Sequence, residues 1–242
     1  MLSASQTSSD QEQVPSERRA GRERPNSRGE ATRLLILETA ERLFAERGIT
    51  AVPLREIGLA AGQRNNVVVQ YHFGDRERLL REITSYRARA SEQVRTEQLA
   101  NLFGRPQPPV VSDLVKAFVV SLVRNLEEGN HYLAFLSRYV IERGGYRGLE
   151  GSVSTSAVNV MLSMLRQMLP DYPEALLDER WTNTMTGSVH TLARYQAAMQ
   201  SGTLPAPIEE LIDDLVVVLS AGLEAPPLRG DAGSSVTSTS SH

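Results

Sequence analysis

The chain has 242 residues, 40% of them hydrophobic, which is enough for one large or two small folded domains. It has no cysteine, which excludes disulfide scaffolds, thiolate metal sites and cysteine nucleophiles, and it shows no long apolar run or signal peptide, which predicts a cytoplasmic protein without a membrane span. The net charge of −3 conceals an excess of Arg in residues 16–90, which carry 15 Arg against 10 acidic residues and so suit a polyanionic partner.

Residues 1–29 are rich in Ser, Gln, Glu and Arg and contain too few large apolar residues to fold, so we expect a disordered, Arg-containing tail. Two interpretations of this tail remain open. It can be an arm that follows DNA phosphates, or a solvated leader whose Glu residues dilute its charge. Residues 226–242, rich in Pro, Gly, Ser and Thr, are expected to be a second disordered tail.

The first predicted helix spans residues 32–47, because Ile36, Ala40 and Phe44 recur at helical spacing on one face and Gly48 ends the pattern. A second short helix is predicted over 54–61. Since Ile57 lies on its inner face, it can pack beneath the first helix.

Gly62 supplies the turn to a third helix over about 65–72, and a helix-turn-helix of this kind lays its second helix in the DNA major groove. Val69 and Phe73 fall on its inner face. Asn and Gln can bond bidentately to adenine and a Tyr hydroxyl suits phosphate, while Arg76 stands at the start of a long fourth helix capped by Asp75. The outward-facing side chains of the third helix are those of Asn65, Asn66, Gln70 and Tyr71.

Further helices are predicted at about 112–128, 131–143, 152–169, 174–200 and 206–223, separated by Gly and Pro. The expected fold is therefore all-α: a three-helix helix-turn-helix head joined by a long helix to a helical bundle for ligand binding and dimerisation. The division is 1–29 tail, 30–76 DNA-binding domain, 77–225 ligand-binding and dimerisation domain, and 226–242 tail.

Residues of the head and of the fourth helix resemble the TetR family of bacterial regulators. The resemblance rests on Ile36–Gly48, Arg55–Ile57, Ala60–Gly62 and Tyr71–Leu80. It implies a homodimer that binds double-stranded DNA and is released by an effector, with the last two long helices forming the dimer interface. The recognition positions carried over are Val67, Val68, Gln70, Tyr71 and His72, with Arg76 as a phosphate contact, and Arg64 completes the DNA-binding set.

Three residues or segments depart from the family pattern. Pro53 stands where a Ser or Thr usually caps the second helix and touches phosphate, and proline cannot donate that bond. Gly58 replaces a usual Ala, at a cost of about 1 kcal/mol in a helix interior unless close packing needs it. Between Gly62 and Phe73 the chain has one residue more than the common pattern, which changes the register at the start of the third helix.

The bundle offers aromatic and Met side chains that suit either an apolar effector cavity with a few polar handles or an ordinary core. Considered one by one, these positions favour the core, and the resemblance favours a cavity. No metal site and no cofactor are expected. The candidate effector-binding residues are Tyr132, Phe135, Tyr139, Met161, Met164, Met168, Trp181, Met185 and His190.

The last two helices carry more apolar surface than one chain needs, and we expect them to pair across a two-fold axis. An enzyme built on a helical bundle is disfavoured, because the chain has no phosphate-cradling Gly motif and no His-Glu-x-x-His pair. A helical protein-interaction module without DNA binding is a further alternative, which the Arg excess opposes. Repression rather than activation follows from family habit alone.

Overall fold

The computed structural model describes residues 24–65, 67–146 and 156–227, and within these ranges the chain forms nine α-helices, one 3-10 turn and no strand. The predicted all-α fold is therefore confirmed. No described helix combines the length and hydropathy of a membrane span. The elements are α1 (Arg24–Arg47), α2 (Leu54–Ala60), α3 (Val68–Phe73), α4 (Arg76–Phe103), α5 (Val111–Val123), η1 (Arg124–Leu126), α6 (Tyr132–Arg143), α7 (Ser156–Met168), α8 (Glu174–Gln200) and α9 (Ile208–Glu224).

Helix α1 begins at Arg24, well before the predicted start at residue 32. Pro25 lies in its first turn, where the missing proline N–H would have no helical partner in any case, so the helix tolerates it. The last residues of the expected N-terminal tail, 24–29, are thus helical. The remainder of that tail, 1–23, and residues 228–242 lie outside the described residues.

Two further helices, α6 and α8, end where the sequence predicted. Helix α8 has the predicted bounds, and α6 ends at Gly144, whose left-handed conformation (φ 65°, ψ 39°) glycine adopts without strain. The segment predicted as one helix over 112–128 is instead α5 followed by the 3-10 turn η1.

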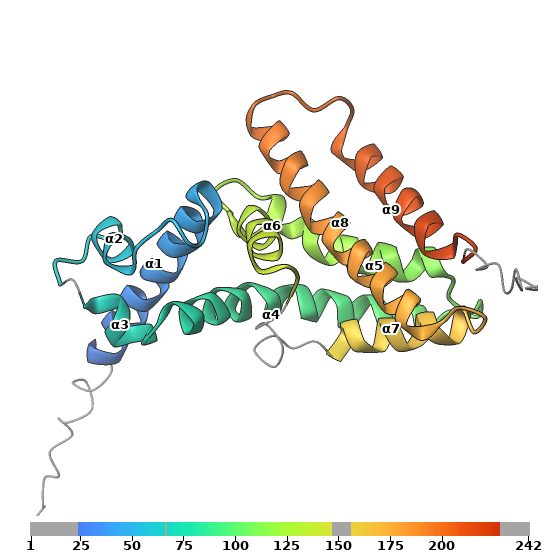
Figure 1. Cartoon of the computed structure of the whole chain (residues 1–242), viewed down its shortest axis with the longest axis horizontal. Coiled ribbons are helices and arrows are strands. Elements are labelled where there is room, and N and C mark those ends of the chain that lie inside the picture. The colour runs from blue at the N-terminus through green and yellow to red at the C-terminus, as the bar shows by residue number, and fades with distance from the viewer. Residues whose placement is uncertain (1–23, 66, 147–155, 228–242) are drawn as a thin grey trace, which may run out of the picture.

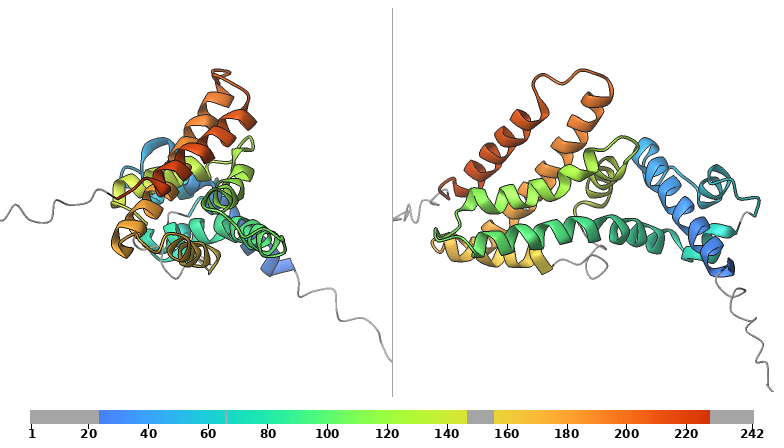
Figure 2. Two further views of the ribbon diagram at one scale, coloured as in Figure 1. Left: turned by 90° about the vertical axis from the view of Figure 1, so that its right-hand side faces the viewer. Right: turned by 180° about the vertical axis from the view of Figure 1, so that it is seen from behind.

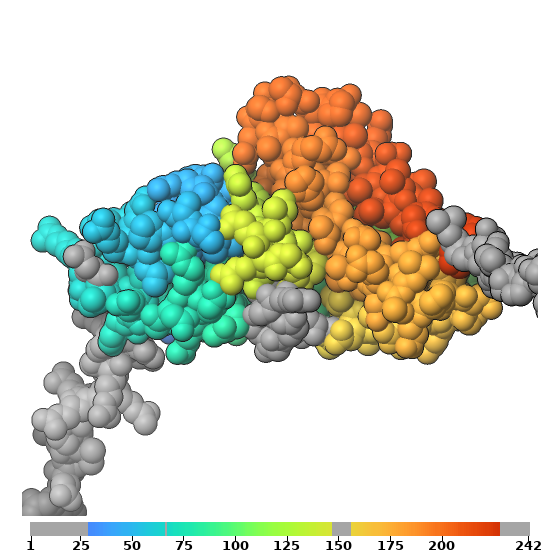
Figure 3. Space-filling model, in the orientation of Figure 1, coloured from blue at the N-terminus to red at the C-terminus, as the bar shows by residue number. Residues whose placement is uncertain are grey.

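The head, α1 to α3, lies at one end of an elongated molecule, and α4 runs from it along the bundle (Figures 1 and 2). Helix α5 is central, packing against α4, α7, α8 and α9. Helices α8 and α9 form a hairpin whose connecting loop projects from the body. In the space-filling view, α6 occupies the surface between α1 and α8 (Figure 3). It is therefore placed to contact both the head and the hairpin.

One hydrophobic core extends through both the head and the bundle. Its link is Phe44 of α1 against Phe135 of α6, both fully buried, with ring centroids 6.3 Å apart. The head therefore packs against α4 and α6 and shares their hydrophobic core. The sequence had suggested a domain boundary at residue 76.

Candidate nucleic-acid interface

Two glycines set the geometry between α2 and α3. Gly62 has φ +69°, a conformation that L side chains rarely adopt, and this turns the chain after α2. Gly58 is buried, and a Cβ atom there would lie 3.3 Å from Cγ1 of Val68. The close approach of the two helices therefore accounts for Gly58, one of the departures from the family pattern.

The inner face of α3 anchors it to the head. Val69 and Phe73 are 1% exposed and, with Ile57 of α2, belong to the same core cluster as Leu43 and Phe44 of α1. The predicted burial of the inner face of α3 is confirmed. Because the buried side chains hold α3 at a fixed angle to α2, the outer face of α3 has a defined direction.

The outer face of α3 carries the side chains best suited to reading bases. Gln70 is exposed, and the Tyr71 side chain is 84% exposed. His72 is half-buried and packs edge-to-face with Tyr71, with ring centroids 5.2 Å apart. Val67, just before α3, is 53% exposed. The structure thus brings four of the predicted DNA-binding residues together, three on α3 and Val67 at its N-cap.

The turn before α3 uses part of the polar set internally. The Asn65 side-chain oxygen accepts a hydrogen bond from the Val67 amide (3.1 Å), and its carbonyl accepts from Val68 (3.2 Å). These bonds start α3 three residues later than predicted, so Asn65 stands in the turn and not on the helix. Asn66 lies outside the described residues. Arg64 is exposed and has no ion-pair partner among the described residues.

Arg76 points inward, although we predicted a phosphate contact. Its guanidinium donates to the carbonyl oxygen of Ile49 and lies over the Phe44 ring, 5.8 Å from the centroid. Asp75 caps α4 as predicted, its side chain accepting from the Arg78 amide (2.7 Å). Pro53 precedes α2 and makes no side-chain cap, in line with the departure noted in the sequence.

Much of the positive charge of the head is already paired. Arg33 and Arg47 form ion pairs with Glu82 and Glu56, and hydrogen bonding to Glu56 raises the pKa of Arg47. The excess of 15 Arg over 10 acidic residues in 16–90 already counts these glutamates, so the pairs leave the net charge unchanged, but the paired guanidinium groups are less available to DNA phosphates.

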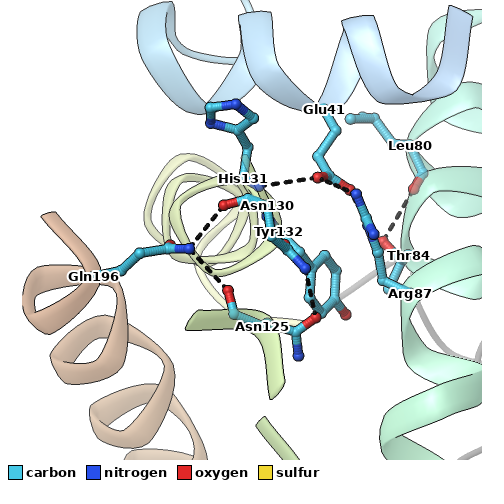
Figure 4. A network of polar contacts seen from close by, with 9 residues as sticks. All are labelled: Glu41, Leu80, Thr84, Arg87, Asn125, Asn130, His131, Tyr132 and Gln196. Atoms are coloured by element: carbon cyan, nitrogen blue, oxygen red, sulfur yellow. Dashed lines mark hydrogen bonds and ion pairs between the residues drawn. The ribbon is translucent and has the colours of Figure 1, made fainter. Parts of the chain in front are cut away.

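Two glutamates that connect the head to α6 were not singled out in the sequence. Glu41 of α1 is 1% exposed and makes two hydrogen bonds with Arg87 of α4, at 2.7 and 2.9 Å (Figure 4). Burial alone would lower the pKa of Arg87, but the bonds and charge of Glu41 outweigh it and raise that pKa. Glu142 accepts from the amides of Ile49 (3.1 Å) and Thr50 (3.3 Å). The sequence feature that could have identified Glu41 is a carboxylate on the apolar face of α1. No such feature marks Glu142.

The candidate effector residues do not share one environment. Six are buried and two, Met168 and Met185, are half-buried, whereas His190 is exposed and bonds Ser137 Oγ through Nδ1 (2.9 Å). The surface position of His190 does not fit a cavity-lining role. The buried ones are Tyr132, Phe135, Tyr139, Met161, Met164 and Trp181.

The buried candidates divide into two groups. The α6 aromatics form a series that continues into the head through Phe135 and Phe44. Trp181 of α8 instead packs edge-on against Phe118 of α5 (5.5 Å), within the bundle. Trp181 Nε1 is buried and has no hydrogen-bond partner within the described structure. The second group therefore has an unsatisfied donor that a bound molecule could use.

A buried ion pair holds the start of α7. Glu92 of α4 accepts hydrogen bonds from the Ala157 amide (2.8 Å), Ser156 Oγ (2.7 Å) and the Arg95 guanidinium (3.1 Å). Burial on its own would raise the pKa of Glu92, but these bonds and the Arg95 charge outweigh it and lower the pKa. Arg95 also donates to Ser121 of α5 (3.1 Å), so the pair joins three helices.

Two family models match the sequence over most of the folded chain. Residues 36–83 match the model described as bacterial regulatory proteins, tetR family. Residues 114–222 match the model described as tetracyclin repressor-like, C-terminal domain. The first match covers the helix-turn-helix and the start of α4, and the second covers most of the bundle. No curated protein matches the sequence.

Solved structures share the fold. A TetR family transcription regulator from Marinobacter aquaeolei VT8 is 17% identical, with a TM-score of 0.55 over 81% of this chain and 97% of that one. A putative tetR family transcription regulator from Shewanella sp. PV-4 is 14% identical, with a TM-score of 0.51 over 78% of this chain and 95% of that one. At these identities the likeness extends to the fold alone.

Proposed function

The chain belongs to the TetR family of bacterial regulatory proteins, and from this premise we propose that it is a repressor that binds a palindromic DNA operator as a homodimer and is released by a small, largely apolar effector. A regulator of this kind acts on the chromosome, so we place it in the cytoplasm. We assign it no catalytic role. The exposed face of α3 is the observation that carries the proposal.

The proposed contacts with bases come from Gln70 and Tyr71, because both are exposed on a helix whose opposite face is locked in the core. A Gln amide pairs bidentately with adenine, and a Tyr hydroxyl reaches a phosphate or base edge. Val67 and His72 flank them and can contact thymine methyl groups and the backbone. Arg64, in the turn, is the best-placed cation for a neighbouring phosphate.

The proposed dimer interface is the α8–α9 hairpin. Val217 and Val218 of α9 are 65% and 59% exposed, although α9 also packs against α5 and α8 and its Leu215 and Leu223 are buried. Adjacent exposed aliphatic side chains on a projecting hairpin favour burial against a second copy. Two-fold pairing would set two α3 helices toward successive major grooves, as a palindromic operator requires.

The proposed effector site is the part of the bundle around Trp181. Its unsatisfied Nε1–H offers a hydrogen bond to an acceptor on an otherwise apolar ligand, and Phe118 supplies a neighbouring ring. Met161 and Met164 of α7 are candidates for the lining, since their side chains adapt to different shapes. Trp181 is the only tryptophan of the chain, so its fluorescence reports on this region alone.

Selection of binding sites from a random duplex library tests the proposal, with a Gln70→Ala, Tyr71→Ala double variant in parallel. We expect the wild type to enrich a palindrome and the folded double variant to lose it. A matched control is Gln167→Ala, an exposed substitution on α7 that should leave the enriched sequence unchanged. Failure of the wild-type protein to enrich any sequence would refute the proposal.

A further inference from the structure

Helix α6 is bonded to the head at both of its ends. At its start, the His131 amide donates to Glu41 Oε1 of α1 (3.2 Å). At its end, Glu142 accepts from the amides of Ile49 and Thr50 in the α1–α2 loop, and Arg143 pairs with Glu77 of α4 (2.6 Å). A shift of α6 must therefore either carry the head with it or break these bonds.

The bond at the start of α6 involves a buried charge. Glu41 is 1% exposed, and its carboxylate is shared between Arg87 of α4 and the His131 amide. A buried carboxylate is stable only while its partners are in place, because its desolvation is not otherwise offset. The positions of α1, α4 and the start of α6 are consequently interdependent.

The loop of residues 125–131, which ends at His131, is bonded on its other side to α8. Gln196, 4% exposed, donates through Nε2 to the carbonyl oxygens of Asn125 and Asn130, each at 2.8 Å (Figure 4). The Asn130 side chain bonds Asn125 (3.3 Å) and accepts from the Tyr132 amide (2.9 Å). Thus Gln196 fixes the loop conformation that presents the His131 amide to Glu41.

We propose that Gln196, the 125–131 loop and Glu41 form a polar relay through which a displacement of α8 changes the seating of the DNA-binding head. Hydrogen bonds are directional and break over small displacements, whereas the Phe44–Phe135 contact can slide. Losing the Gln196 bonds frees the loop, and the freed loop withdraws the His131 amide from Glu41. The relay rests on the proposed function, because it gives the bundle a route to α3, and it adds the residues that transmit the signal.

Amide hydrogen exchange, resolved to single residues in the free full-length protein, tests the relay without DNA. Gln196→Met keeps side-chain length and removes the donor, and we expect exchange of the His131 amide to accelerate about three- to tenfold, as expected for the loss of one or two hydrogen bonds. Gln167→Met, the same change at an exposed position of α7, should leave His131 unaffected. If Gln196→Met does not fold, Asn130→Ala, at a half-exposed position, is expected to give the same acceleration.

A double-variant cycle then measures coupling. In a Glu41→Gln variant, Gln196→Met should accelerate exchange of the His131 amide by a smaller factor. The reason is that Glu41→Gln has already weakened the hydrogen bond from the His131 amide to residue 41. Multiplicative effects, or an unchanged His131 amide in Gln196→Met and Asn130→Ala, would overturn the relay. On the selected duplex, Gln196→Met should weaken binding by about three- to tenfold. A protein that shows coupled exchange but binds no DNA would refute the proposed function and retain the relay.

Discussion

Arg76 lies at the predicted position on its helix, but its side chain contacts the protein interior and not the solvent side. It stands in the first turn of α4, where its guanidinium could reach a phosphate, but Ile49 and the ring of Phe44 take it inward. In this position Arg76 ties the α1–α2 loop to α4. Arg64 is an exposed cation in the turn directly before α3, where it can reach a phosphate.

We therefore predict that Arg76→Ala and Arg64→Ala have different effects. Arg76→Ala should lower the free energy of unfolding by about 1–2 kcal/mol, because a buried carbonyl loses its donor and an aromatic ring loses its cation. Arg64→Ala should leave stability unchanged and reduce the slope of log affinity against log salt by about two, because each subunit of the proposed dimer loses one phosphate contact. Urea unfolding and binding titrations at several salt concentrations distinguish them. If Arg76→Ala left the stability unchanged and reduced the salt slope, Arg76 would be a phosphate contact and the inward role would be contradicted.

At the scale of residues, the sequence correctly predicted which α3 side chains face the core. It did not predict side-chain orientations that depend on contacts with residues far away in the chain. Helical spacing alone places Val69 and Phe73 inside and Gln70 and Tyr71 outside. The direction of Arg76, in contrast, depends on Ile49, 27 residues earlier in the chain. Periodicity carries no information about such a partner.

Helix α7 depends on a side chain of another helix for its beginning. Glu92 of α4 accepts from Ser156 and Ala157 and so caps α7. Its pKa is lowered from the ordinary value of 4.5. A lowered pKa means that the stabilisation is complete above the unfolded-state value and is lost as the pH falls through the native one.

We predict that Glu92→Gln lowers the free energy of unfolding at pH 7 by about 2–4 kcal/mol, because it leaves Arg95 buried without a counter-charge. As the pH falls from 4.5 through the lower native pKa the difference from wild type should shrink, since the wild-type carboxylate then becomes protonated too. Urea unfolding between pH 7 and pH 3 measures both effects. Glu97→Gln, an exposed change on the same helix, is the control, and a difference that grows toward low pH would contradict the assignment.

At the scale of helices, the sequence predicted most helix positions but not the contacts that hold one helix against another. Gly48 and Gly144 ended α1 and α6 as predicted, because glycine accepts the positive φ found at both positions. The start of α1 was misplaced because polar residues 24–31 extend the helix without any apolar period. The binding of Glu142 to the α1–α2 loop depends on how α6 docks, which no local pattern encodes.

The whole molecule is proposed to act as a two-headed dimer, and the exposed side of α9 is where we expect the second chain. Val217→Asp should convert the protein to a monomer of 26.7 kDa, because a charge buried in an apolar interface is not compensated. Light scattering at micromolar concentration measures the mass. Val160→Asp, at an exposed position of α7, should leave the dimer intact; a wild-type monomer, or a dimeric Val217→Asp, would contradict the interface.

At this scale the sequence supplied the architecture but not a defined effector site. The nine candidates were chosen for chemistry, and the structure distributes them among the head junction, the bundle interior and, for His190, the surface. Aromatic and Met residues at helical spacing look alike in a core and in a cavity. The orphan Nε1 of Trp181 depends on the packing of α5 against α8, and only the folded chain reveals it.

The central claim is that α3 enters DNA from two symmetric subunits, and the absence of cysteine permits a direct test. A single-cysteine variant, Val67→Cys, can carry a DNA-cleaving chelate at the start of α3, with Val160→Cys on α7 as the matched control. On the selected duplex we predict two symmetric cleavage tracts about one helical turn apart from Val67→Cys and none from Val160→Cys. A single tract, or equal cleavage from both variants, would contradict the account.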